Sequence, residues 1–253
     1  MIEQIPDSPE RAAPEAKPEP EAKPKTVLIA NVKGGCGKTT VAATLVSALA
    51  AAGARVVLAD ADRQRSGLTW FGRRAAVERP VGALDWTRKT DIGAWAPPLA
   101  PETTDWLVID APGALKTGRM ERLVALADFV LTPVMPSLFD AMAAQRFVLQ
   151  VENLRRVRAG ETEILMIANR LRQRGRATQD LSSFFARIEI EPAAEIEERA
   201  VYGQLAAHGL GLFDRDGAGL DPVKRQWLPL LRAMGLRVDA LAAPERATRA
   251  DIA

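Results

Sequence analysis

A short glycine-rich stretch decides the fold of this chain: Lys33-Gly34-Gly35-Cys36-Gly37-Lys38-Thr39-Thr40. An apolar run at residues 27–30 precedes it, and a helix-forming run at residues 41–46 follows it. A strand, a glycine loop and a helix start in this order are typical of a phosphate-binding loop, whose backbone N–H groups point at phosphate oxygens. In such a loop Lys38 reaches the β- and γ-phosphates, and the Thr39 hydroxyl ligates Mg²⁺.

The loop departs from the usual G-x-x-x-x-G-K-T spacing at its first position. The first glycine of that pattern would fall at Val32, and a second lysine, Lys33, follows instead. Taken alone, the stretch predicts binding of ATP or GTP. The extra lysine is a feature that phosphate binding does not explain.

Length and composition limit the remaining possibilities. The 253 residues suffice for one sizeable α/β domain. Because 34 Lys and Arg face 32 Asp and Glu, any nucleic-acid binding must come from a local patch. Cys36 is the single cysteine, which excludes an intramolecular disulfide and a cysteine-ligated metal cluster. With neither a signal peptide nor an apolar run of membrane-spanning length, we expect a cytoplasmic protein without membrane insertion.

The two ends of the chain differ in composition from its middle. Residues 1–25 are rich in proline, glutamate and lysine and lack apolar periodicity, which predicts a disordered tail. An inert extension is favoured there over a partner-binding segment. Residues 241–253 are polar and predict a frayed C-terminal tail, which leaves residues 26–240 as a single domain.

Strand-like and helix-like segments alternate along that domain. Continuous apolar runs occur at residues 27–30, 55–60, 106–110, 129–133 and 164–169. Such runs predict a doubly wound, mostly parallel sheet with helices on both faces. We expect one helix to end at Gly53, and a long one to run from Ser137 or Asp140 to about Arg158, stopped by Gly160. Residues 70–101 predict an irregular insertion anchored in the core by tryptophans.

Polar residues end three of the predicted strands. They are Asp60, Asp110 and Asn169. Because ligands of open α/β sheets bind at the carboxyl ends of the strands, these side chains should converge on the phosphate loop. Asp110 follows an apolar run in the Walker B pattern and should hold Mg²⁺ through its water shell.

The loop with its extra lysine resembles the deviant Walker A loop of the ParA/MinD family of dimeric ATPases. The resemblance implies that Lys33 reaches across a nucleotide sandwich to the phosphates held by the other subunit. A cation supplied in this way acts like an arginine finger, which is worth roughly 10³–10⁵ in rate. The implied nucleotide-binding residues are Gly34, Gly35, Cys36, Gly37, Lys38, Thr39, Thr40, Asn169 and Arg170.

Two acids after the second strand extend the resemblance. Asp60 and Asp62 match the first switch region of the family, which implies that Asp62 orients the attacking water and Asp60 supports the magnesium network. Lys33, Lys38, Asp62 and Asp60 are thus the expected catalytic set, and Thr39, Asp110 and Asp60 the metal set. Arg63 stands where the family commonly has proline.

Later segments resemble the family as well, so that the likeness runs from about residue 26 to residue 234. Residues 111–113 correspond to a second switch, and residues 126–137 to the segment around the following strand. Asn169 and Arg170 lie where relatives contact adenine. Residues 199–202 and 209–214 resemble the closing region of the family.

The C-terminal residues and a group of arginines bear on whether the chain resembles the membrane-binding or the DNA-binding members of the family. The C-terminal residues 242–253 lack the apolar stripe of a membrane-binding helix, whereas ParA-type members bind DNA without sequence preference. Arginines that can pair with phosphates cluster later in the chain. The candidate DNA-binding residues are Arg155, Arg156, Arg158, Arg172, Arg174, Arg176, Lys224 and Arg225.

The sequence therefore predicts a ParA-type ATPase that uses ATP and Mg²⁺. It would form a homodimer on ATP binding, associate with the nucleoid through non-specific DNA binding, and position or segregate a plasmid, chromosome or protein assembly. A ParB-like or cargo-adaptor protein would stimulate hydrolysis. Two alternatives stay open: a nucleotide-switched regulator that acts only through protein partners, and an ATP-dependent metabolic ligase of the same fold.

Overall fold

The computed structural model describes residues 23–74, 77, 81–113, 115–172, 175–239 and 241. Most of both predicted tails, residues 1–22 and 242–253, lies outside these ranges. Two described residues just outside the predicted bounds of 26–240 belong to the folded part. Its first strand begins at Lys25, and Leu241 is buried in the core.

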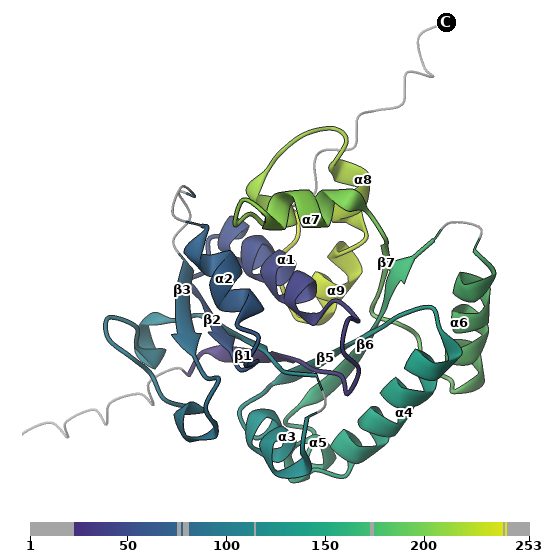
Figure 1. The fold of residues 1–253 in the computed structure, drawn as a ribbon, viewed down its shortest axis with the longest axis horizontal. Helices are drawn as coiled ribbons and strands as arrows, with labels where there is room; N and C mark the ends of the chain where they lie inside the picture. The colour runs from purple at the N-terminus through teal and green to yellow at the C-terminus, as the bar shows by residue number, and fades with distance from the viewer. Residues whose placement is uncertain are drawn as a thin grey trace, which may run out of the picture.

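A parallel sheet forms the centre of the molecule (Figure 1). Its seven described strands follow the order β3-β2-β4-β1-β5-β6-β7, and every neighbouring pair is parallel. This arrangement confirms the predicted doubly wound fold. The strands are β1 Lys25–Ile29, β2 Val56–Asp60, β3 Val81–Asp85, β4 Trp106–Asp110, β5 Phe129–Val134, β6 Glu163–Leu171 and β7 Ala194–Glu197.

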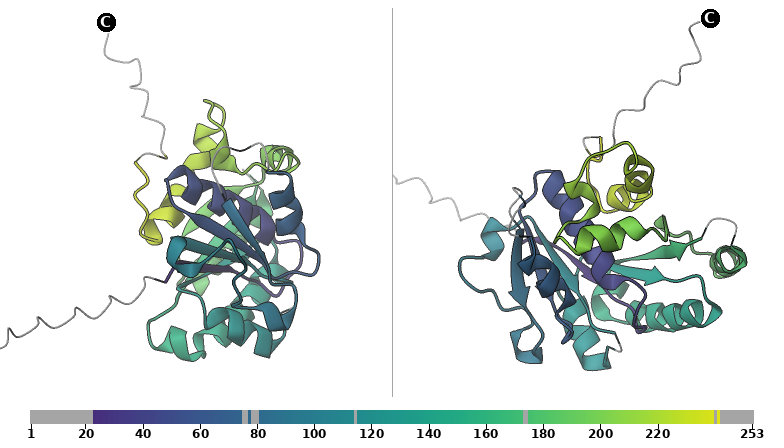
Figure 2. Two further views of the ribbon diagram at one scale, coloured as in Figure 1. Left: turned by 90° about the vertical axis from the view of Figure 1, so that its left-hand side faces the viewer. Right: turned by 45° about the horizontal axis from the view of Figure 1, so that its top comes forward.

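Helices cover both faces of the sheet (Figures 1 and 2). Alternate residues of β1 point to opposite faces, so Val27 and Ile29 join the core beneath α1 whereas Leu28 joins the core beneath α3 and α4. The helices are α1 Lys38–Ala51, α2 Ser66–Gly72, α3 Thr117–Val124, α4 Leu138–Glu152, α5 Arg155–Arg158, α6 Arg176–Arg187, α7 Ala200–Ala206, α8 Asp221–Arg225 and α9 Leu228–Ala233, with short 3₁₀ turns η1 Lys89–Asp91, η2 Pro101–Thr103 and η3 Leu212–Asp214.

The long helix predicted from Ser137 or Asp140 to about Arg158 is divided into α4 and α5. Near the break, the Asn153 side-chain amide donates to the Leu149 carbonyl at 2.6 Å, and such local bonds compete with the helix ladder. Ser137 precedes α4 without a side-chain cap, and Gly160, with φ of 71°, follows the last turn of α5 as expected.

The tryptophan-rich segment is more regular than the sequence predicts, because it contains β3, η1 and η2. Trp70 and Trp86 are buried, and both indole N–H groups donate to backbone carbonyls. Trp95 is half-buried. Two of the three tryptophans are therefore the core anchors that were expected.

Candidate functional site

The phosphate loop leaves β1 and enters α1 at the carboxyl edge of the sheet. Gly35 and Gly37 adopt φ of 78° and 93°, a region that favours glycine. A Cβ on Gly37 would lie 2.6 Å from Nδ2 of Asn169, which itself donates to the Cys36 carbonyl at 2.8 Å. Asn169, at the end of β6, thus holds the loop from the side, close to where the sequence predicted it.

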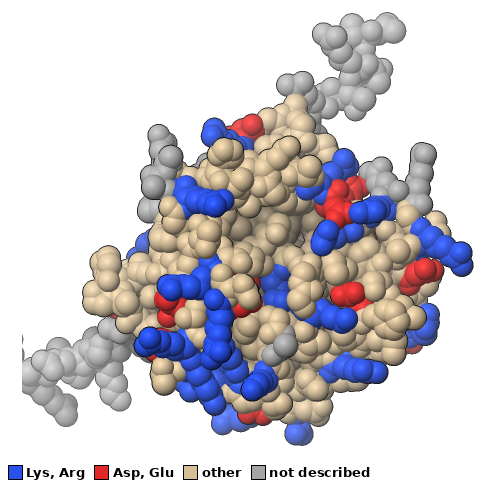
Figure 3. Space-filling view, viewed as in Figure 1, with Lys and Arg blue, Asp and Glu red and all other residues tan. Residues whose placement is uncertain are grey.

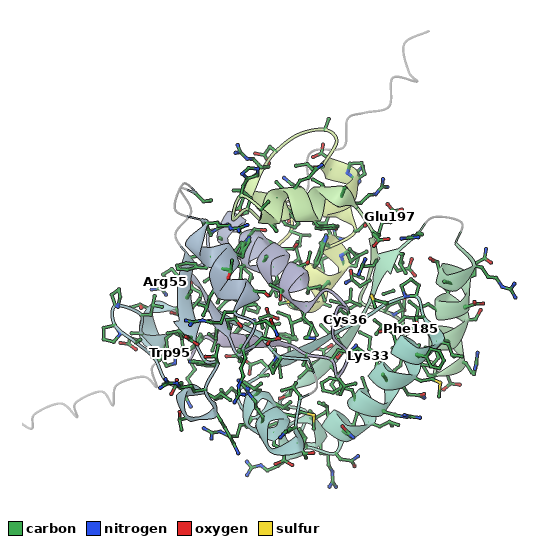
Figure 4. The ribbon with its side chains drawn as sticks, in the orientation of Figure 1. Lys33, Cys36, Arg55, Trp95, Phe185 and Glu197 are labelled. Atoms are coloured by element: carbon green, nitrogen blue, oxygen red, sulfur yellow. The ribbon has the colours of Figure 1, made fainter. Side chains whose placement is uncertain are left out.

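The two lysines of the loop are arranged differently. Lys38 is buried, and its ammonium donates to the Lys33 carbonyl at 2.9 Å. Lys33 is half-buried, and its ammonium makes no hydrogen bond or ion pair with the residues that the structure describes. Figure 4 labels Lys33 and Cys36 on this loop. The cation of Lys38 therefore faces the inside of the loop, whereas that of Lys33 is available to another group.

Asn31 supports the loop from below and was not predicted. Its side-chain amide donates to the Pro133 carbonyl at 2.8 Å, and its Oδ1 accepts a bond from the Lys33 backbone N–H at 3.2 Å. The residue is fully buried. The sequence signal that could have identified Asn31 is its position directly after an apolar run, like that of Asp60 and Asp110.

Thr39 and Asp110 form the part of the site that suits a magnesium ion. The Thr39 hydroxyl donates to Oδ2 of Asp110 at 2.7 Å. The other carboxylate oxygen is buried without a partner, and burial raises the pKa of Asp110 to about 7. Hard oxygen donors with one unsatisfied carboxylate oxygen fit Mg²⁺, which usually takes one or two carboxylates together with substrate phosphates.

The described residues contain no cluster of three or more His, Cys, Asp or Glu that could hold a metal by itself. A magnesium ion in protein sites of this kind takes its remaining ligands from water and from substrate phosphates. The protein's own donors at this point are the Thr39 hydroxyl at the start of α1 and the Asp110 carboxylate at the end of β4.

Asp60 organises the loop between β2 and α2. Its carboxylate accepts the backbone N–H groups of Asp62 at 2.9 Å and Leu68 at 3.0 Å, and burial raises its pKa. Asp60 is paired with Asp110 in the β2–β4 register. Asp62 is half-buried, and its Oδ1 accepts the Gln64 N–H at 3.0 Å. The predicted acids therefore lie on one edge, with Asp62 at the more exposed position.

The predicted second switch packs directly on the phosphate loop. A Cβ on Gly113 would lie 3.4 Å from the Gly34 Cα. This is an ordinary van der Waals distance, so the segment and the phosphate loop are immediate neighbours.

A cavity of about 450 Å³ opens beside the loop on the β6–β7 side. Arg170 stands at its edge with φ of 58°, pairs with Glu198, and donates to the Gly35 carbonyl at 3.4 Å. The structure thus brings Asn169 and Arg170 together with the loop. The lining residues are Gly37, Thr40, Val41, Asn169, Arg170, Ile196, Glu197, Glu198, Arg199, Ala200, Tyr202, Gly203 and Trp227.

The predicted DNA-binding arginines do not form one surface. Arg156 contacts Asp128 at 3.2 Å, and Arg172 contacts Glu198 at 2.7 Å. Lys224 is buried and pairs with Asp216 at 2.9 Å, which removes it from any surface patch. Acids distant in sequence thus neutralise part of the run. Arg174 lies outside the described residues, and the exposed remainder is divided among three helices: Arg155 and Arg158 on α5, Arg176 on α6 and Arg225 on α8.

Comparison with known proteins places this site among nucleotide-binding domains. Residues 27–210 match the model of the CobQ/CobB/MinD/ParA nucleotide binding domain. The maintenance of carboxysome distribution protein A of Halothiobacillus neapolitanus is 28% identical over 198 residues, which cover 77% of this chain and 89% of that protein. The chromosome-partitioning ATPase Soj of Thermus thermophilus is 31% identical over 160 residues, covering 53% of this chain and 64% of that protein.

Solved structures share the fold. Apo McdA from Cyanothece aligns with a TM-score of 0.68 at 21% identity, covering 83% of this chain and 99% of the other. MinD in the MinC:MinD complex of Aquifex aeolicus aligns with a TM-score of 0.62 at 19% identity, covering 84% of this chain and 97% of the other. Among the described residues, no helix has the length and apolar character needed to cross a membrane.

Proposed function

Because the chain belongs to the CobQ/CobB/MinD/ParA nucleotide-binding family, we propose that it is a ParA-type positioning ATPase that closes on ATP as a homodimer. The observation that carries this proposal is Lys33. Its ammonium is uncommitted among the described residues, while its own carbonyl holds the phosphate lysine Lys38. A cation in this position suits the phosphates of a facing subunit.

Each site residue takes a defined part in hydrolysis. The loop N–H groups and Lys38 hold the β- and γ-phosphates, and Thr39 with Asp110 would hold Mg²⁺, which neutralises charge on those phosphates. Asp62 orients a water whose oxygen bonds to the γ-phosphorus as the bond to the β–γ bridging oxygen breaks. ADP and phosphate leave, and Lys33 of the other subunit stabilises the charge that develops.

Exposed apolar side chains beside the loop support self-association. Phe139 is 74% exposed and Leu138 is 62% exposed, and both lie in the first turn of α4. Met135, just before α4, contacts the Arg170 guanidinium that reaches the Gly35 carbonyl. Large apolar groups gathered at one place on a surface mark an interface, and here they adjoin the nucleotide site. A second copy facing this edge would cover them.

The rest of the proposal concerns what the dimer holds. The names of the relatives connect them with carboxysome distribution and with chromosome partitioning. We extend to this chain a cycle in which the ATP dimer binds DNA without sequence preference on the nucleoid. A ParB-like or cargo-adaptor partner then stimulates hydrolysis and release.

The test compares Lys33→Ala with Lys38→Ala in the full chain. We expect Lys33→Ala to bind a fluorescent ATP analogue with Mg²⁺ as the wild type does but to lose stimulated turnover, because only the trans contact is removed. Lys38→Ala should lose nucleotide binding itself. Loss of nucleotide binding in Lys33→Ala would contradict the role across the dimer.

Sedimentation with ATP and Mg²⁺ tests the dimer separately. Phe139→Ser should weaken the ATP-dependent dimer, whereas Leu149→Ser should not. Leu149 is a matched control because it is also exposed, at 53%, on the same helix but lies near its other end. A wild type that stays monomeric with ATP, or equal loss in both variants, would refute the proposed interface.

A further inference from the structure

A second group of cations surrounds the switch loops, away from the arginines that the sequence singled out. Figure 3 shows Lys and Arg gathered at the lower left, where Figure 1 draws η1, α3 and the end of β3. We call this group the switch surface. Its members are all exposed: Arg63 and Arg65 after β2, Arg88 and Lys89 after β3, and Lys116 and Arg122 at α3.

Three chain segments are fastened together beneath these cations. The backbone N–H of Trp86 donates to the Asp60 carbonyl at 2.8 Å, and this bond joins the ends of β2 and β3. Arg119 of α3 is half-buried, and its Nη2 donates to the carbonyls of Ala61, Trp86 and Thr87 at 2.5, 3.0 and 3.2 Å. The switch surface therefore rests on a connected backbone.

Most cations of the switch surface form no ion pair. Arg65 pairs with Asp85 at 2.6 Å, and Arg88 lies near enough to the same carboxylate to help lower its pKa. Across the described ranges, the other members take part in no ion pair or side-chain hydrogen bond: Arg63, Arg88, Lys89, Lys116 and Arg122. This differs from Arg156, Arg172 and Lys224, each of which has an acidic partner.

The switch surface also has few of the apolar side chains that a protein interface needs at its centre. Of the large exposed apolar residues of the described chain, Leu126 lies just after α3 and near η1 and is 36% exposed, whereas the others lie on α4: Leu138, Phe139, Met142 and Leu149. Phosphate contacts need only cations that can reach the backbone of a duplex. Among polyanions, the surface therefore suits nucleic acid better than a folded acidic protein.

We propose that the switch surface binds the phosphate backbone of duplex DNA. This inference rests on the proposed function and names the site of its DNA contact. Arg63 directly follows Asp62, and Arg119 holds the Ala61 carbonyl. A movement of the loop after β2 on ATP binding or hydrolysis would displace these cations, so DNA affinity would follow the nucleotide state without a separate signalling path.

The experiment compares two double variants of the full chain, R88Q/K89Q and R155Q/R158Q. Each removes two exposed cations that lack ion pairs, so the net charge changes equally, and neither touches the nucleotide site. Binding of a short random-sequence duplex is measured with ATP, with ADP and without nucleotide, over a series of salt concentrations. With ATP, R88Q/K89Q should lower the slope of log Kd against log salt by about 3.6, because the proposed dimer loses four phosphate contacts and each contributes about 0.9.

The control R155Q/R158Q should keep the wild-type slope, and both variants should keep basal ATP turnover. If the wild type binds DNA with ATP but R88Q/K89Q keeps its slope, the switch surface is refuted while the DNA part of the proposed function stands. If the wild type binds no duplex in any nucleotide state, that part of the function fails and the inference fails with it. Equal affinity for poly-L-glutamate and for duplex would indicate an acidic polypeptide partner and would also overturn the inference.

Discussion

Replacing Asp214 by asparagine should destabilise the domain much more than the same change at Asp105. Both carboxylates pair with an arginine through two hydrogen bonds, Arg74–Asp214 at 2.5 and 2.8 Å and Arg55–Asp105 at 2.7 and 3.1 Å. The exposed side-chain fractions differ: 4% and 0% for the first pair, 60% and 40% for the second. Burial is therefore the main variable between them.

The expected magnitudes follow from that difference in burial. Breaking a buried pair leaves an uncompensated charge and costs about 3–5 kcal/mol, which is roughly 6–20 °C in Tm for a domain of this size. Breaking an exposed pair costs about 0–1 kcal/mol. Asp214 also accepts the Gly211 N–H at 2.7 Å, so its loss would loosen the segment that packs against α1.

Urea unfolding of Asp214→Asn, Asp105→Asn and the wild type measures the two costs. Adding Arg74→Met to Asp214→Asn should recover part of the lost stability, because the buried unpaired guanidinium is then removed. Equal costs at Asp214 and Asp105 would refute the reasoning. So would a double variant less stable than Asp214→Asn alone.

Three further predictions concern the loop and its neighbours. Gly37→Ala should lower the free energy of unfolding by about 1–3 kcal/mol because of its positive φ, whereas Gly34→Ala, with open space at its Cβ, should be nearly neutral in thermal unfolding. Burial raises the pKa of Asp110 to about 7, so between about pH 5 and pH 7 the folded state keeps a proton on this carboxyl that the unfolded state has released. The free energy of unfolding of the nucleotide-free wild type should therefore fall by about 1.4 kcal/mol per pH unit relative to that of Asp110→Asn, as measured in urea titrations. A constant difference between the two proteins would contradict this. Cys36 is buried with a raised pKa, so a thiol reagent should label it slowly until denaturant is added, and rapid native labelling would contradict its placement.

The sequence predicts the centre of the sheet better than its edges. The five predicted strands are buried and read as continuous apolar runs, and the structure confirms them. The edge strands β3 and β7 were missed because an edge strand is covered less completely. In Ala194–Glu197 two acids alternate with buried residues, and in Val81–Asp85 a glycine interrupts the run. Neither pattern matches the run that identifies a central strand.

In the candidate site, residues that belong to short sequence motifs were predicted, whereas residues whose partners are distant in sequence were not. The phosphate loop and the ends of β2, β4 and β6 follow from short motifs, and the structure gathers them at one edge. Arg119 escaped prediction because its partners are backbone carbonyls of distant segments, and the role of Asn31 was missed because its amide donates to the distant Pro133 carbonyl. The arginine run was judged as one patch because sequence spacing does not reveal that Glu198 faces Arg172.

The bond from the Lys38 ammonium to the Lys33 carbonyl has a consequence for ligand exchange. A phosphate that recruits Lys38 replaces one good acceptor by another, so the net gain from this contact is smaller than the charge of the ligand suggests. The Lys33 carbonyl keeps the Cys36 thiol as a donor at 3.4 Å after Lys38 has moved to a phosphate. Capture of the nucleotide therefore changes the acceptor of Lys38 while the loop keeps its internal contact with Cys36.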